Sequence, residues 1–141
     1  MDQILFHFEE VQTNILTHPK LTQNWLVSVA RDENAAIEQL NYIFCTDEYL
    51  LQINQQFLNH DNYTDVITFP YSSSPIVADI YISIDRVEEN YQQYGCTFQE
   101  ELTRVMVHGL LHLVGYNDKS KDEVELMREK ESAYLSLLLN T

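Results

Sequence analysis

The sequence predicts a single α/β (α+β) domain over residues 1–141, with a small mixed sheet of about four strands packed by about five helices. Three observations predict this fold class. The length of 141 residues suits one domain, and the chain contains no repeat, linker or low-complexity tract. Apolar residues make up 45% of the chain and charged residues 21%, which is typical of a globular protein. Strand-like and helix-like patterns follow one another in the order β-α-β-α-β-β-α-α-α.

The first half of the chain predicts two strands that alternate with two helices. A weak alternation of apolar residues predicts a strand over Ile4–Phe8. Apolar side chains at helical spacing predict a helix over Leu21–Ala30. β-Branched and aromatic residues predict a strand over Ile37–Cys45. Asp47 is suited to cap a helix that runs through Phe57.

Two short strands are predicted next. The first covers Asp65–Phe69 and is expected to end at Pro70, because proline has no backbone N–H to donate. Residues 72–75 contain three serines and a proline, which predict a loop. The second strand, Val77–Ile84, alternates cleanly and is predicted to bury one face, while Asp79 points from the other face.

Three helices are predicted to complete the chain. Each is preceded by a capping side chain with an acid three residues later. These pairs are Asp85 and Glu88, Thr97 and Glu100, and Ser120 and Glu123. The helices are expected to end near Gly95, Gly115 and about Leu138.

The helix over Phe98–Val114 carries the chemical signal. Its last two turns are apolar except for His108 and His112, so both imidazoles are expected to be largely buried and to need partners. Residues four apart on a helix are neighbours, so both rings can reach one metal ion. Asp118 follows the helix stop and is placed to add a carboxylate ligand. Two core histidines that hydrogen-bond carbonyls or acids remain the alternative.

The segment 108–118, HGLLHLVGYND, resembles the H-G-x-L-H-L-x-G-Y-D-H signature of the YbeY family of bacterial rRNA maturation factors. Other segments that resemble the family occur in the same order along the chain. They are TDVITFP over 64–70, DIYIS over 79–83, Glu101-Leu102, and Met127 with Glu131. The resemblance is close from Ile53 to Glu131. It implies a single α/β domain.

The resemblance also implies an enzyme, a metal-dependent endoribonuclease that cleaves single-stranded RNA. One metal ion, usually zinc, would be held by His108, His112 and Asp118. The implied role is maturation of 16S rRNA and assembly or quality control of the small ribosomal subunit. The implied partners are therefore rRNA, the small subunit and, as an open question, ribosome-assembly proteins.

The chain departs from the family pattern at several positions. Asp118 stands where the family has a third histidine, so another divalent transition metal remains possible beside zinc. A family arginine associated with phosphate chemistry falls on Leu58. Tyr63 and Ala78 replace a proline and a glycine of the family motifs. These departures bear on the catalytic prediction more than on the fold.

Three further side chains are predicted to take part in catalysis. Asp65 and Asp79 are candidates for a general base or for holding a metal ligand in place, and Arg86 for binding a phosphate, which Arg104 could also do. Each has a structural alternative. Asp65 suits a turn at the start of a strand, and Arg86, like Arg104, suits a surface ion pair with nearby acids. An acid within a strand such as Asp79 calls for a specific partner.

Composition limits the remaining function classes. The net charge of −14 argues against tight, non-specific binding of nucleic acid, and we expect no DNA partner. No apolar run is long enough for a transmembrane helix, and the N-terminus lacks the features of a signal peptide. Cys45 and Cys96 form no ligand pair and are expected to stay reduced. We therefore expect a cytoplasmic protein without a membrane partner.

Two other function classes remain open at this point. Gly109 follows His108 where zinc peptidases of the H-E-x-x-H kind carry their catalytic glutamate, which argues against a peptidase. A metal-dependent hydrolase of another substrate remains possible. The stronger alternative is a non-catalytic ribosome-assembly factor with a bound metal, because Leu58 removes a presumed catalytic arginine.

Overall fold

Over the residues that the structure describes, the fold contains one four-stranded mixed sheet and five helices in the predicted order, which confirms the predicted fold class. The computed structural model describes residues 3–58 and 65–139. The strands are β1 (Ile4–Glu9), β2 (Ile37–Cys45), β3 (Val66–Ser73) and β4 (Ile76–Ser83). The helices are α1 (Pro19–Asp32), α2 (Asp47–Leu58), α3 (Ile84–Tyr94), α4 (Phe98–Leu113) and α5 (Lys121–Leu139).

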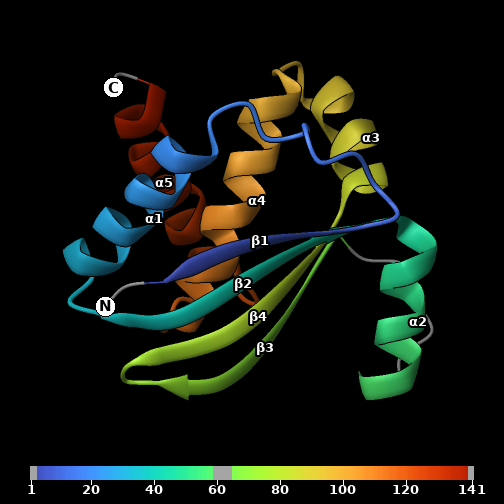
Figure 1. Ribbon diagram of the computed structural model, residues 1–141. Coiled ribbons are helices and arrows are strands. Elements are labelled where there is room, and N and C mark those ends of the chain that lie inside the picture. The colour runs from blue at the N-terminus through green and yellow to red at the C-terminus, as the bar shows by residue number, and fades with distance from the viewer. Residues whose placement is uncertain (1–2, 59–64, 140–141) are drawn as a thin grey trace.

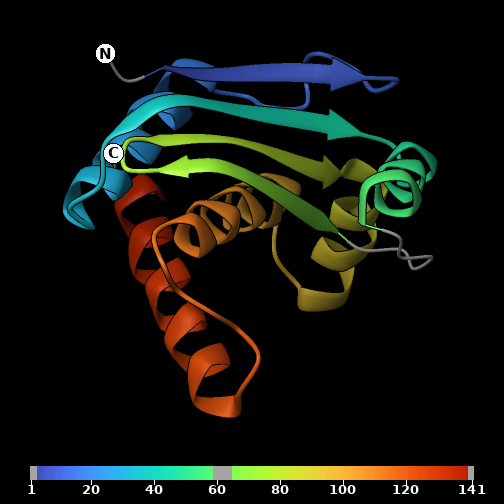
Figure 2. The ribbon, with the colours of Figure 1, turned by 90° about the horizontal axis from the view of Figure 1, so that it is seen from below.

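The sheet has the strand order β1-β2-β4-β3. β2 pairs in parallel with both β1 and β4, and β3 pairs antiparallel with β4 at the edge. Figures 1 and 2 show α1, α3, α4 and α5 on one face of the sheet, while α2 lies beside the end of β2 and β4. The helix α4 therefore has the sheet on one side and α5 on the other.

Two apolar clusters hold these layers together. The larger one joins the inward side chains of β1, β2 and β4, including Ile80 and Ile82, to α1, α4 and α5. The smaller one packs Leu50 of α2 against Cys45 and Ile67, which lie on the other face of the sheet. Successive side chains of β4 therefore point alternately to the helical face of the sheet and to its other face, as the alternation in the sequence predicts. Within the described residues, no helix is long and apolar enough to cross a membrane.

The edge strand β3 is longer than predicted. It continues through Pro70 to Ser73, and the predicted loop shrinks to a turn at residues 74 and 75. Proline is tolerated there because an edge strand has one side without a sheet partner, and the register shifts between Pro70 and Ser72. The predicted strand ended too early because proline is excluded from central strands but not from edge strands such as β3.

Two predicted helix caps are replaced by their neighbours. The side chain of Thr46, not Asp47, accepts a hydrogen bond from the Tyr49 backbone N–H at 3.1 Å. Ser83, not Asp85, caps α3 by accepting from the Arg86 backbone N–H at 3.3 Å. The other two predicted capping boxes are confirmed, at Thr97 with Glu100 and at Ser120 with Glu123.

Candidate metal centre

The two histidines of α4 lie one turn apart on the same side of the helix. Their ring centroids are 4.7 Å apart with an interplanar angle of 81°. The side chains are only partly exposed, 21% for His108 and 28% for His112. Both imidazoles are thus shielded by the protein yet open on one side, as a metal site with an accessible position requires.

The turn after α4 brings Asp118 to the two histidines. Its Oδ2 atom lies 3.4 Å from the Nε2 atom of His108 and 3.4 Å from the Nε2 atom of His112. The three ligand atoms all lie within 4.8 Å of one another. Two atoms bound tetrahedrally to one zinc ion at about 2.0–2.1 Å are separated by roughly 3.4 Å. The two His–Asp distances match that separation, so His108, His112 and Asp118, which we call the His–His–Asp cluster, could hold one ion.

The backbone explains why Asp118 can reach back. The helix α4 ends at Leu113, and Gly115 adopts a φ of +113°, which side chains with a Cβ rarely allow. The Tyr116 N–H then donates to the carbonyl of Leu111 at 3.0 Å. The Tyr116 hydroxyl also donates at 2.8 Å to Glu33, which directly follows the last residue of α1. The turn that carries Asp118 is thus fixed to two helices.

A buried glutamate from α5 orients His108. One carboxylate oxygen of Glu131 lies 2.6 Å from His108 Nδ1, and the other accepts from Arg104 at 2.9 Å. Burial alone would lower the pKa of His108, but the hydrogen bond and charge of Glu131 raise it, with smaller contributions from Asp118 and Asp65. Because Glu131 occupies Nδ1, the Nε2 atom is left to face Asp118. A histidine ligand is commonly held by an acid in this way.

The role of Glu131 was not predicted, although the residue forms part of the resemblance to the family. Its position in α5 holds the signal that could have revealed it. Met127, Glu131 and Tyr134 lie on the buried side of α5, and Glu131 is only 4% exposed. A carboxylate at helical spacing among apolar residues predicts a buried partner, in this case the histidine helix.

A cavity of about 180 Å³ opens beside the His–His–Asp cluster. His108 and Asp118 line it, together with Asp65, which lies just before β3. The structure therefore brings Asp65 to the same cavity as two of the three predicted ligands. Its backbone carbonyl also accepts from the Ser83 N–H at 3.0 Å, which ties this segment to the end of β4.

Glu101, one turn before Arg104 on α4, lines the same cavity and was noted in the sequence only as part of a family motif. Its side chain is only 4% exposed. Burial raises the pKa of Glu101 to about 7, although the charge of Arg104 opposes that shift. A carboxyl group with this pKa is partly protonated near neutral pH and is a candidate for function.

Asp79 lies on the opposite face of the sheet from the histidine helix. Its neighbours Ile80 and Ile82 point to the α4 side, so Asp79 points away. Its carboxylate accepts from Asn41 at 3.0 Å and from the Tyr71 hydroxyl at 2.9 Å. The acid within the strand thus has its partners, and the structure does not bring it to the His–His–Asp cluster.

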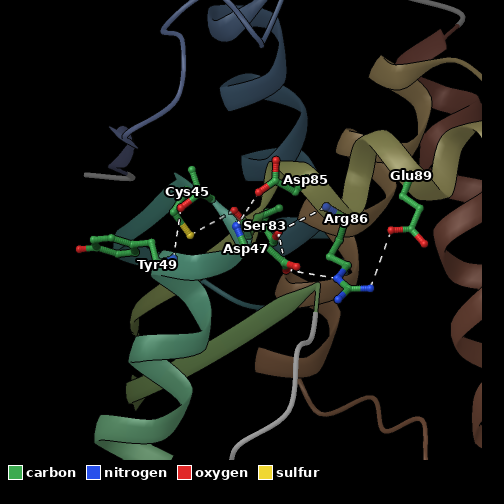
Figure 3. Close-up of polar contacts among 9 residues, drawn as sticks. Cys45, Asp47, Tyr49, Ser83, Asp85, Arg86 and Glu89 are labelled. Atoms are coloured by element: carbon green, nitrogen blue, oxygen red, sulfur yellow. Dashed lines mark hydrogen bonds and ion pairs between the residues drawn. The ribbon is translucent and has the colours of Figure 1, made fainter.

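Arg86 is also held away from the cavity. Its Nε atom lies 3.2 Å from Asp47, and a terminal nitrogen lies 3.9 Å from Glu89 (Figure 3). The hydroxyl of Ser83 also donates to Asp47 at 3.2 Å. These contacts join the start of α3 to the start of α2. They match the ion-pair alternative for Arg86 and do not place its guanidinium with the His–His–Asp cluster.

The departures from the family motif near the end of α2 are only partly described. Leu58 is the last residue of α2, but its side chain lies outside the described part of the structure, as do Tyr63 and Thr64. Ala78 is buried in β4, at the position of the family's glycine. Cys45 and Cys96 are both free.

Comparison with known proteins gives a consistent family. The family model described as Endoribonuclease YbeY matches residues 3–138. A protein from Cytophaga hutchinsonii named Endoribonuclease YbeY is 50% identical over 138 residues, which cover 96% of each chain. One of the same name from Flavobacterium psychrophilum is 56% identical over 115 residues, which cover 81% of this chain and 82% of the other.

A solved structure has the same fold. The solution structure of a protein from Thermotoga maritima matches with a TM-score of 0.68 at 28% sequence identity. The match covers 96% of this chain and 89% of that chain. The arrangement of sheet and helices described above is therefore shared with a chain of quite different sequence.

Proposed function

This chain belongs to the YbeY family of endoribonucleases, and on that premise we propose that it cleaves single-stranded RNA with the help of one metal ion on His108, His112 and Asp118. The observation that carries the proposal is the convergence of three ligand atoms at the edge of a cavity. Within the described residues this cluster contains three ligands, whereas structural zinc sites commonly have four protein ligands. An open position for water or substrate is therefore expected.

We propose zinc as the resident metal. Two imidazoles and one carboxylate are a donor set that zinc uses in catalytic sites. The carboxylate of Asp118 also suits harder divalent metals, so another divalent transition metal is the alternative to zinc at this site. When bound, such an ion lowers the pKa of a bound water and polarises a phosphoryl oxygen. The protein supplies orientation, because Glu131 holds His108 by its Nδ1 atom at 2.6 Å.

Among the three predicted catalytic side chains, Asp65 is the one that we keep in the proposal. It lines the cavity with His108 and Asp118, so its carboxylate is suited to accept a proton from the attacking group. That group is either water or a ribose 2′-hydroxyl. Asp79 and Arg86 lie elsewhere and are assigned no part in the chemistry.

The substrate that we propose is rRNA, and the role is maturation of 16S rRNA during assembly or quality control of the small ribosomal subunit in the cytoplasm. The support is the name Endoribonuclease YbeY, which is shared by relatives whose matches cover 81–96% of this chain. The net charge of −14 favours a partner that positions the RNA, because an acidic protein attracts free RNA poorly.

The test combines metal content with cleavage. Protein purified without a histidine tag or chelator should contain about one transition metal per chain, and His112→Ala should lose it. Cleavage of a single-stranded 16S rRNA fragment should stop with chelator and return with zinc. Full metal content in a His108→Ala, His112→Ala double variant would overturn the metal site. Binding to small-subunit particles without any cleavage would instead favour the non-catalytic assembly factor.

A further inference from the structure

A second cavity continues the one beside the His–His–Asp cluster. It has a volume of about 380 Å³ and lies between the end of α3, the start of α4 and the last turns of α5. Four residues line both cavities, namely Tyr94, Glu101, Arg104 and Arg128. These four define what we call the side groove. It starts next to His108 and leads away from the cluster, so a chain bound at the cluster can extend along it.

The side groove contains cations in an otherwise acidic protein. Among the described residues that line the two cavities, the basic ones are two arginines, Arg104 and Arg128, and there is no lysine. Arg104 is fixed by Glu131 at 2.9 Å and by the Ser132 hydroxyl at 3.3 Å. Arg128 is exposed, and no carboxylate within residues 3–58 and 65–139 forms an ion pair with it. Its charge is therefore available to an incoming anion.

Tyr94 adds an aromatic surface at the same place. It is the last residue of α3 and is 56% exposed, so much of its ring is accessible to a ligand. The guanidinium carbon of Arg128 lies 5.9 Å from the centroid of the Tyr94 ring. Unpaired RNA bases stack on aromatic rings and on arginine planes, and arginine also binds the adjoining phosphate. An exposed tyrosine beside an unpaired arginine matches that chemistry.

Glu101 supplies the third observation. Its side chain is nine-tenths buried, yet its carboxyl makes no hydrogen bond or ion pair with the described residues. Among those residues, every side-chain nitrogen or oxygen that is fully shielded from solvent has a hydrogen-bond partner. The Glu101 carboxyl has none, so it is not fully shielded and must border the cavity that Glu101 lines. A largely buried carboxyl without a partner is unfavourable, and a ligand that hydrogen-bonds to it removes this penalty.

We propose that the side groove binds one unpaired nucleotide of the RNA substrate next to the scissile bond. Arg128 and Arg104 each take one of the two phosphates that flank this nucleotide, Tyr94 stacks on its base, and Glu101 hydrogen-bonds to the edge of that base. This inference rests on the proposed function, because it assigns the groove to the same substrate. An acidic peptide would satisfy the two arginines but would leave the tyrosine face and the Glu101 carboxyl without partners.

The test measures binding of a fluorescein-labelled single-stranded RNA dodecamer to the zinc-loaded protein by fluorescence anisotropy. Measurements at low temperature, with the RNA analysed on a gel after each titration, separate binding from cleavage. Arg128→Gln and Tyr94→Leu should each weaken binding by about 5- to 50-fold, because stacking is worth about 1–3 kcal/mol per base. Lys20→Gln removes one charge from an exposed position on α1 and should change affinity less than twofold.

Glu101 is tested by two replacements. Glu101→Gln keeps a donor and an acceptor and should retain affinity, whereas Glu101→Leu should lose several-fold. Thermal denaturation of each variant verifies that it is folded. In parallel cleavage assays, Arg128→Gln should raise KM more than it lowers kcat, as expected for a group that binds the flanking nucleotide.

The outcomes distinguish the two proposals. If the wild type cleaves RNA and the Arg128 and Tyr94 variants bind as Lys20→Gln does, the nucleotide subsite is wrong and the proposed function stands. If the wild type cleaves no RNA but binding weakens in both variants, the subsite stands and the proposed nuclease function is wrong. Competition by poly-glutamate as strong as that by RNA would overturn the subsite, because the groove would then be only a cationic patch.

Discussion

Glu131 shows how one buried side chain organises the candidate metal centre. It contacts His108 at 2.6 Å and Arg104 at 2.9 Å, so it fixes a ligand and a cation of the side groove at once. We predict that Glu131→Gln lowers zinc affinity by about 10- to 100-fold, as expected when the partner of a metal-bound histidine is lost. Competition with a chromophoric chelator measures this change.

Glu129→Gln provides the matched control for that variant. Glu129 belongs to the same helix, carries the same charge and is exposed. Its replacement should leave zinc affinity within twofold of the wild type. Equal affinities for the Glu129 and Glu131 variants would show that His108 needs no partner from α5.

Glu101 predicts a pH dependence of stability. Its pKa in the folded protein is about 7, above the usual value of 4.5, because burial disfavours the charged form. The folded state therefore binds more protons than the unfolded state between these values, and stability falls as the pH rises from about 4.5 to 7. We expect Glu101→Gln to remove this contribution, on the order of 1–3 kcal/mol.

Urea denaturation at pH 5 and pH 8 with chelator present checks that prediction. The stability of the wild type relative to Glu101→Gln should be higher at pH 5 than at pH 8. Comparison with the variant cancels the contribution of other groups, including His108, whose raised pKa also makes stability fall with rising pH. The same difference between the two proteins at both pH values would contradict the assigned pKa.

The individual residues differ in how far the sequence could place them. His108 and His112 could be paired because helical spacing is regular over one turn, and Asp118 because a glycine stop turns the chain back. Asp79 and Arg86 could not be placed, since their partners Asn41 and Asp47 are more than 35 positions away in sequence. Only the packing of β2, β4 and α2 reveals those contacts.

At the scale of elements, α4 and β4 are in unusually close contact. A Cβ atom on Gly109 would lie 3.0 Å from Cδ1 and 3.1 Å from Cγ2 of Ile80, which is fully buried. Packing against Ile80 thus disfavours a side chain at position 109. We predict that Gly109→Ala destabilises the protein by about 1–2 kcal/mol, because overpacking outweighs the better helix propensity of alanine.

Ile80→Val tests whether that contact is the cause. Alone it should destabilise the protein by about 0.5–1.5 kcal/mol, because it removes a buried methyl group. In the Gly109→Ala background it should be less harmful, since it removes the nearer of the two clashing atoms. Urea denaturation of the four proteins gives the coupling energy. Strict additivity would show that the alanine is accommodated without involving Ile80.

The turn after α4 is an element held by its hydrogen bonds. The hydroxyls of Tyr116 and Tyr134 both donate to the Glu33 carboxylate. Although burial opposes the shift, these hydrogen bonds lower the pKa of Glu33. We predict that Tyr116→Phe lowers stability by about 1 kcal/mol and zinc affinity several-fold, because Asp118 lies two residues further along this turn.

Tyr49→Phe on α2 removes a hydroxyl far from the turn and serves as the control. Zinc titration of both variants with the same chelator should show a loss only for Tyr116→Phe. If both variants bind zinc as the wild type does, the contact with Glu33 contributes to stability alone and the turn is held by its backbone.

Most elements could be predicted from the sequence because their signals are local. Each of the two capping boxes depends on two residues three positions apart, and the alternation of β4 depends on successive residues of one strand. The extension of β3 through Pro70 could not be predicted, because it depends on β3 lying at the edge of the sheet. The order β1-β2-β4-β3 sets that position, and it is a property of the whole fold.

At the scale of the whole molecule, the net charge and the placement of the helices have opposite effects on RNA binding. The chain carries a net charge of −14, yet the helical side of the sheet places Arg104 and Arg128 beside the candidate metal centre. In the proposed binding mode an incoming RNA is repelled at a distance and meets two arginines at the side groove. Composition alone argues against tight, non-specific binding of nucleic acid, while α4 and α5 place two arginines together beside the candidate metal centre.

This balance predicts a weak salt dependence of RNA binding. If Arg104 and Arg128 neutralise two phosphates, counterion release gives a slope of about −1.4 for the logarithm of affinity against that of salt concentration. Screening of the long-range repulsion acts in the opposite direction, so the observed slope should be no steeper than this value. Anisotropy titrations from about 50 to 300 mM KCl measure it, since the Debye length falls from about 14 to about 6 Å over that range. Arg128→Gln should flatten the slope by about 0.7, and Lys20→Gln should leave it unchanged. A slope several times steeper would mean that many more cations contact the RNA than the side groove provides.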